Sequence, residues 1–147
     1  MSLDYQVSQK IVTPQLAGLT DNTSRSNLLP ETNGLGYTTG SGGAVTQETS
    51  VTTTVELNKL CGQITTFALT LAAGVDTTFQ LTNSFIAAGD VVVVSTKSYG
   101  GTADGIPIAS VQATAAGSCK INIRNTGATT LDALAVINFA VIKAVAA

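Results

Sequence analysis

The sequence predicts an all-β protein: an antiparallel β-sandwich or jelly-roll barrel of about eight strands, with an extended N-terminal arm. Short β-branched runs separated by turn residues recur from Val45 onward. Thr and Val dominate these runs, and their stiff side chains disfavour a helix. The first 43 residues differ, because they hold two of the three prolines and end in a glycine-dense stretch at 34–43. We therefore divide the chain into an arm with a Gly-rich hinge, residues 1–43, and a β domain, residues 44–147.

Alternating apolar and polar residues identify the strands of the β domain. Val75, Phe79 and Leu81 share one face while polar residues occupy the other, and residues 119–123 repeat the pattern. Such alternation is typical of strands with one buried and one wet face. The expected strands span residues 45–50, 51–57, 62–67, 75–82, 90–97, 106–114, 118–125 and 134–143.

The arm begins with a strand-like period of two. Leu3, Tyr5 and Val7 alternate with polar residues, and Ile11 and Val12 follow. In an extended strand the first three side chains would lie on one face, which favours β-strand addition to a partner with these five residues in its pockets. Two alternatives remain open: the arm packs on a neighbouring copy of its own oligomer, or it only tethers the domain.

Two runs are apolar on both faces, Val91–Val94 and residues 135–142. A second layer of the same domain could cover the second face, or a partner subunit could do so. Because so small a chain has little second layer to offer, we favour a subunit interface. The residues expected at this interface are Val92, Val94, Ile137, Phe139 and Val141.

Composition excludes several classes of partner. Charged residues are 11% of the 147, against about 25% in typical soluble domains. The net charge of −2, without a basic run, argues against nucleic-acid binding. The apolar runs are shorter than the roughly 20 residues that span a bilayer, and the N-terminus lacks the pattern of a signal peptide. We expect a protein made without secretion, with neither nucleic acid nor membrane as a partner.

The residues offer little for catalysis. His is absent, which removes the common catalytic triads and the commonest general base. Cys61 and Cys119 are too few for a zinc site and are expected to be small buried apolar side chains, with a disulfide as the lesser alternative. Acidic residues at strand ends are ordinary turn chemistry; they are Asp76, Asp90, Asp104 and Asp132. We expect no catalytic residue, cofactor or metal site, and therefore no enzyme.

The run from Gly34 to Gln47, followed by residues 55–65, resembles a module of tailed-bacteriophage virion proteins. Later segments fit the same pattern in order, and the resemblance spans about residues 34–143. These segments are Phe79–Ser84, Asp90–Val94, Ile123–Asn125 and Val136–Lys143. The resemblance implies compact β domains that decorate phage heads or end tail fibres, act without catalysis and form trimers.

We therefore expect a capsid decoration, or cement, protein on the outer capsid surface of a virion. Its partners would be the major capsid protein and itself, as a homotrimer, with residues 1–33 adapted to the particular particle. The main alternative is a tail or head fibre, or receptor-binding domain, although such proteins normally carry a longer shaft or heptad repeats, which this chain lacks. A carbohydrate-binding module is a further alternative, disfavoured by the scarcity of aromatic residues.

Overall fold

The computed structural model describes residues 28–31, 34–38 and 40–144. The chain divides into two units, residues 1–39 and 40–147. In the first unit, β1 (Leu28–Glu31) pairs antiparallel with β2 (Gly34–Tyr37). Gly34–Tyr37 is therefore a strand, in a segment where the sequence predicted a flexible hinge. The second unit begins a few residues before the predicted boundary at 43/44.

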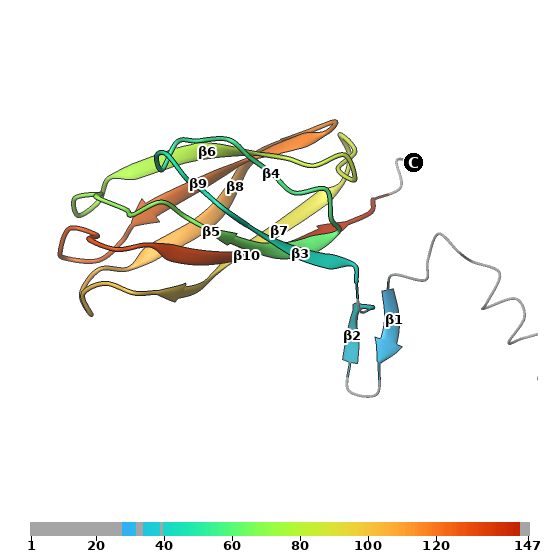
Figure 1. Cartoon of the computed structure of the whole chain (residues 1–147), viewed down its shortest axis with the longest axis horizontal. Coiled ribbons are helices and arrows are strands. Elements are labelled where there is room, and N and C mark those ends of the chain that lie inside the picture. The colour runs from blue at the N-terminus through green and yellow to red at the C-terminus, as the bar shows by residue number, and fades with distance from the viewer. Residues whose placement is uncertain (1–27, 32–33, 39, 145–147) are drawn as a thin grey trace, which may run out of the picture. The chain divides into compact units, whose positions relative to one another are not determined.

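The described part of the second unit consists of strands, turns and loops, with no helix (Figure 1). This confirms the all-β prediction for these residues. The strands are β3 (Gly42–Thr46), β4 (Val55–Glu56), β5 (Cys61–Thr65), β6 (Asp76–Thr82), β7 (Val91–Tyr99), β8 (Pro107–Ala115), β9 (Ser118–Asn125) and β10 (Ala135–Ile142).

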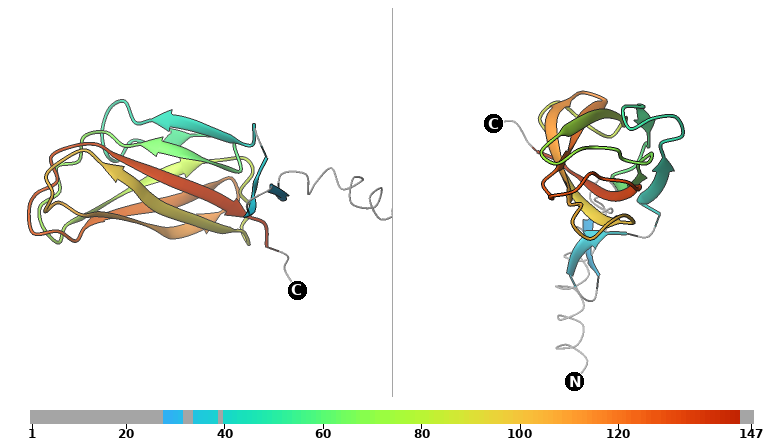
Figure 2. Two further views of the ribbon diagram at one scale, coloured as in Figure 1. Left: turned by 90° about the horizontal axis from the view of Figure 1, so that it is seen from below. Right: turned by 90° about the vertical axis from the view of Figure 1, so that its left-hand side faces the viewer.

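The eight strands form two four-stranded sheets, ordered β3-β5-β10-β7 and β4-β6-β9-β8. The sheets lie face to face around a shared interior, and they do not close into a barrel (Figure 2). This arrangement is consistent with the β-sandwich that the sequence predicted as one of two forms. The expectation of purely antiparallel sheets is wrong, because β3 runs parallel to β5 and β4 runs parallel to β6.

The segment between β3 and β4 departs most from the predicted strands. The sequence predicted strands at 45–50 and 51–57, but residues 47–54 form a loop. The cause is Gln47, which is only 2% exposed. Its Nε2 donates to the carbonyls of Val51 (3.2 Å) and Thr53 (2.8 Å), and its Oε1 accepts from Phe67 N (3.1 Å). A buried amide thus holds the loop where β-propensity favoured a strand.

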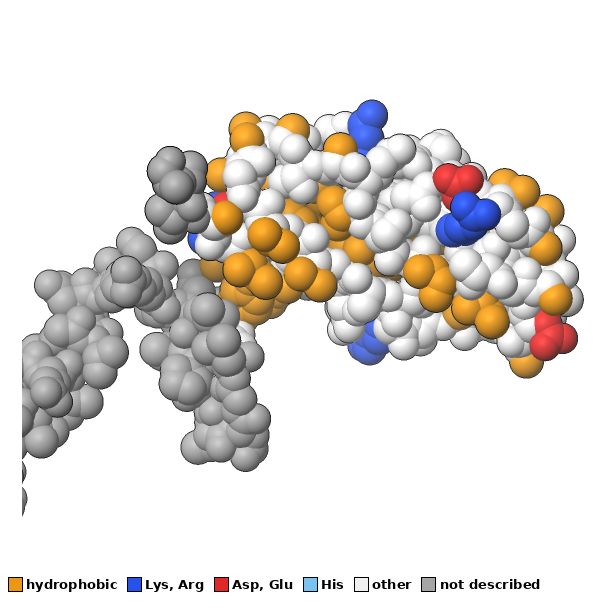
Figure 3. All heavy atoms as spheres, turned by 180° about the vertical axis from the view of Figure 1, so that it is seen from behind, with side chains coloured by type: hydrophobic (Ala, Val, Ile, Leu, Met, Phe, Trp, Pro, Cys, Tyr) orange, Lys and Arg blue, Asp and Glu red, His pale blue; other side chains and the backbone are white. Residues whose placement is uncertain are grey.

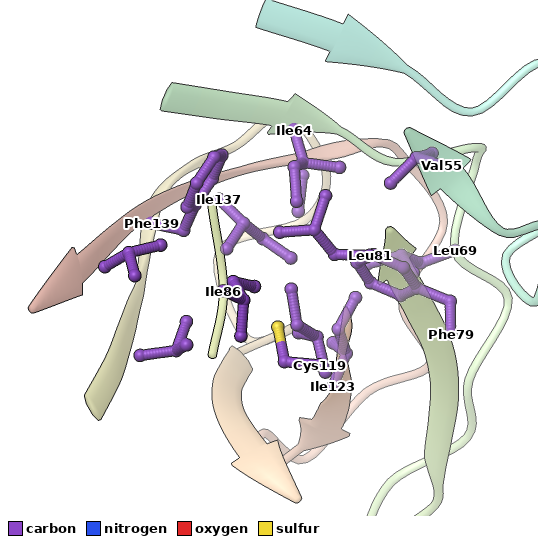
Figure 4. Packing of buried hydrophobic residues seen from close by; sticks show 14 of the residues in the cluster. Val55, Ile64, Leu69, Phe79, Leu81, Ile86, Cys119, Ile123, Ile137 and Phe139 are labelled. Carbon is purple, nitrogen blue, oxygen red and sulfur yellow. The ribbon is translucent and has the colours of Figure 1, made fainter. Parts of the chain in front are cut away.

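The core is an aliphatic layer between the sheets (Figure 4). Ile64 and Ile137 point inward from one sheet, and Leu81 and Ile121 point inward from the other; all four are at most 1% exposed. The alternation predicted for β6 and β9 is confirmed at Phe79, Leu81 and residues 119–123. Val75 is the exception, because it precedes β6 and is 45% exposed.

Glycine is required where β5 passes Phe139. Gly62 pairs with Phe139 across the β5–β10 ladder. A Cβ at Gly62 would lie 2.5 Å from the carbonyl oxygen of Gly43 and 3.0 Å from Cε1 of Phe139. Any side chain there would push β3 or the aromatic ring away, so this glycine allows three strands to pack around the ring.

One open side of the sandwich is bridged by a hydroxyl. Thr96 Oγ1 on β7 donates to the carbonyl of Pro107 (2.8 Å) and accepts from Ala109 N (3.2 Å) on β8. The two edge strands thereby share hydrogen bonds although they belong to different sheets. On the opposite side, β3 and the two-residue β4 remain as edge strands.

Truncating Phe139 is expected to destabilise the domain strongly. Phe139→Ala should lower the free energy of unfolding by about 3 to 5 kcal/mol, because the side chain is 3% exposed and its loss leaves a cavity. Denaturant unfolding followed by circular dichroism measures the change. Ser110→Ala, on the exposed face of β8, serves as the control and should change stability by less than about 0.5 kcal/mol. A loss below about 1 kcal/mol for Phe139→Ala would contradict the packing described.

Candidate interaction surface

The residues that the sequence assigned to a subunit interface lie in the core instead. Val92, Ile137, Phe139 and Val141 are at most 8% exposed, and Val94 is half-buried against the same cluster. Their side chains face the opposite sheet, so this choice of interface residues is wrong. In a strand that is apolar on both faces, alternation alone does not say which face is inward. The outward residues on the same strands are the ones open to a partner.

The five arm residues assigned to partner contact are Leu3, Tyr5, Val7, Ile11 and Val12. All of them lie outside the described residues.

The outer faces of the two sheets differ in charge. Within β3, β5, β7 and β10 the one charged residue is Lys97. The other sheet exposes four charged side chains. These are Glu56, Asp76, Lys120 and Arg124. Figure 3 shows one side of the molecule, on which apolar and neutral polar side chains far outnumber charged ones. The β3-β5-β10-β7 sheet thus presents a nearly uncharged outer face.

Three exposed aliphatic side chains stand at one end of this face. Val91, Val93 and Ile142 are 53%, 48% and 50% exposed. Val91 pairs with Ile142 across the β7–β10 ladder, and Val93 pairs with Ala140, so the three gather on two neighbouring strands. We call this group the aliphatic knob. Clustered exposed apolar side chains of this kind mark interaction sites more often than scattered ones do.

Beside the knob, the same face is hollowed over β3, β5 and β10. The hollow has a volume of about 390 Å³. It is lined by Gly42, Gly43, Cys61, Gly62, Gln63, Asn138 and Phe139. Glycine causes it, because the position beside Cys61 on β3 is Gly42, which carries no side chain. We call it the glycine hollow; no charged group lines it.

An ion pair between the exposed Lys143 and the buried Asp90 holds the chain just after β10. Asp90, with its side chain 1% exposed, accepts from Lys143 Nζ (2.5 Å), Ala87 N (2.7 Å) and Ala144 N (3.3 Å). Burial raises the pKa of Asp90, but these hydrogen bonds and the charge of Lys143 outweigh it and leave the pKa below its ordinary value. This Asp90 clamp fixes the end of β10 beside the start of β7, where the knob lies.

Tyr99 and Asp132 join two loops at the other end of the domain. Tyr99 Oη donates to Asp132 Oδ1 (2.8 Å) and accepts from Asp132 N (2.7 Å), and Thr102 N also donates to Asp132 Oδ1 (3.2 Å). The hydrogen bonds from Tyr99 and Thr102 lower the pKa of Asp132. Burial, more than the nearby carboxylate, raises the pKa of Tyr99. The cluster is fully engaged in holding the loops, which is a structural role.

The remaining candidate groups do not assemble into a chemical site among the described residues. Cys61 and Cys119 are both free thiols. Burial raises the pKa of Cys119 to about 11, and it also raises that of the half-buried Cys61, so neither is an activated thiolate. Residues 28–31, 34–38 and 40–144 bring no three His, Cys, Asp or Glu side chains together as metal ligands. In this part of the chain no helix is long and apolar enough to cross a membrane.

The chain matches no family model, and it matches neither a curated protein nor a solved structure.

Acid should weaken the Asp90 clamp. Since the folded-state pKa lies below the unfolded value of about 3.9, the stabilisation is present above that value and is lost as pH falls through the folded pKa. Asp90→Asn, which cannot accept in the same way, is expected to lower the free energy of unfolding at pH 7 by about 1 to 3 kcal/mol. It should also flatten the fall in stability below about pH 4. Chemical denaturation at several pH values tests this, and parallel pH profiles for both proteins would contradict it.

Proposed function

We propose that this protein is a non-catalytic structural component of a tailed-bacteriophage virion. It decorates and stabilises the capsid by binding the shell of major capsid protein as a trimer on the outer surface. The β domain is the displayed body, and the N-terminal segment attaches it to the shell. A head or tail fibre is the alternative use of the same kind of domain.

The observation that carries this proposal is the contrast between the two outer faces. One sheet exposes four charged side chains beside the single aliphatic Ile108, while the other exposes the clustered Val91, Val93 and Ile142 on an almost uncharged face. Large neutral faces with exposed apolar groups are used for contacts between proteins. Assembly is therefore a better reading of this surface than catalysis.

The resemblance to phage virion modules supports the same proposal. Its first segment, from Gly34 to Gln47, includes β2 and β3, and residues 55–65 include β4 and β5. The later segments fall on β6, β7, β9 and β10. The matching pattern thus follows the strands of the sandwich in order, rather than one isolated loop.

Copy number on purified particles tests the proposed role. Particles purified through a density gradient should retain the protein at a number approaching that of the capsomers, measured by quantitative mass spectrometry against the major capsid protein. A few copies per particle would favour a fibre instead. Absence from particles would overturn the virion role.

Removing residues 1–39 is expected to separate attachment from folding. The truncated chain should keep a cooperative thermal transition, because the buried apolar residues of the core lie between Val55 and Val141. It should lose binding to shells that lack the protein, measured by co-sedimentation, while the full chain binds. Full retention of shell binding would show that the β domain, and not the N-terminal segment, makes the attachment.

A further inference from the structure

The aliphatic knob and the glycine hollow lie at the same level of one sheet face. The register places Gly42 beside Cys61, Cys61 beside Ala140, and Ala140 beside Val93. Val93 and Cys61 are therefore two strands apart, at a distance of ~10 Å. Side chains stand roughly perpendicular to a sheet, so the knob cannot bend into the hollow of its own chain. The knob can therefore enter only the hollow of another copy.

We propose that the occupant is a second copy of this chain, with the knob of one copy seated in the glycine hollow of the other. The hollow suits a small uncharged group, because no charged side chain lines it and Gly42 leaves it open. Val93 and its neighbours in the knob are such groups, and they need cover from water. Each copy therefore carries both halves of one contact.

Charge favours this sheet over the other as the contact between copies. Like faces of the β4-β6-β9-β8 sheet would bring together identical sets of charged side chains from two copies, including Asp76 and Arg124. The knob and the hollow carry none, so a contact between two copies there removes no charged side chain from water. Within the contacting strands the one charged residue is Lys97, four residues beyond Val93, and Lys143, which follows Ile142, is paired with Asp90.

The contact gives a twofold pair. The knob and the hollow lie ~10 Å apart on one sheet face, so a copy whose knob enters the hollow also covers the knob beside it. A twofold axis then seats both knobs in both hollows, and such a contact is isologous. This pair follows from the sheet face alone and does not depend on the trimer of the proposed function.

A disulfide between copies tests the contact in the full chain. In Val93→Cys, the introduced thiol and Cys61 of the same chain would be ~10 Å apart, whereas disulfides need Cα atoms within about 4.4 to 6.8 Å. Diamide, a mild thiol oxidant, takes up the two electrons and two protons as each bond forms. We expect covalent dimers on a non-reducing gel that revert to single chains on reduction. The matched control, Val93→Cys with Cys61→Ser, should remain uncrosslinked.

Two further variants test the contact without a covalent cross-link. Val93→Asp puts a charge on the knob, and Gly42→Leu fills the hollow; a Cβ at Gly42 makes only ordinary contact, at 3.4 Å from Cys61 Sγ. Each should shift the mass measured by analytical ultracentrifugation to that of one chain, 14.9 kDa, with an unchanged circular dichroism spectrum. Ser110→Asp, on the exposed face of the other sheet, should leave the assembly intact.

The outcomes separate this contact from the proposed function. A wild-type protein that sediments as a monomer, or variants at Val93 and Gly42 that keep the assembled mass, would overturn the contact even if the protein decorates particles. Covalent trimers or longer covalent chains as the end product would overturn the twofold pair. An assembled protein that is absent from particles would overturn the virion role and leave the contact standing.

Discussion

β10 lies between β5 and β7, and the alternation of its side chains defines both surfaces of their sheet. Its odd-numbered residues, from Ala135 to Val141, are buried against the second sheet. Its even-numbered residues form the middle of the outer face. Among them, Asn138 borders the glycine hollow and Ile142 is part of the aliphatic knob. A slip of one residue in this strand would exchange the two sets, so the core and the outer face depend on the same register.

Buried polar side chains help to hold the loops between the strands. Asn83 Nδ2 donates to the carbonyl of Lys59 (2.6 Å), and Asn125 Nδ2 donates to the carbonyls of Leu71 (2.9 Å) and Thr129 (2.7 Å). Both side chains are fully buried. With Gln47 and Asp90, they fix loops that also carry buried apolar residues, among them Leu71, Ile86 and Leu131. Every buried side-chain nitrogen or oxygen of the described residues has a partner.

The division of charge between the two outer faces makes the two sides of this small domain chemically different. The charged face of the β4-β6-β9-β8 sheet is suited to water, while the neutral face is suited to a neighbouring molecule. In a decoration protein such an arrangement would let copies associate with one another through one sheet and leave the other displayed. The Asp90 clamp lies where β7 begins and β10 ends, so it supports the strand ends on which Val91 and Ile142 stand.

The sequence alone determined the all-β class, and it predicted β9 at residues 118–125, as observed. It also predicted which residues share a face in β6 and β9, because polar and apolar side chains alternate there. The parallel pairing of β3 with β5, the loop held by Gln47 and the inward face of β10 were decided by the tertiary structure. When both faces of a strand are apolar, the opposing sheet chooses the buried one, and local periodicity carries no information about that sheet. The hollow depends on three strands distant in sequence, so it could be recognised only once Gly42 lay beside Cys61.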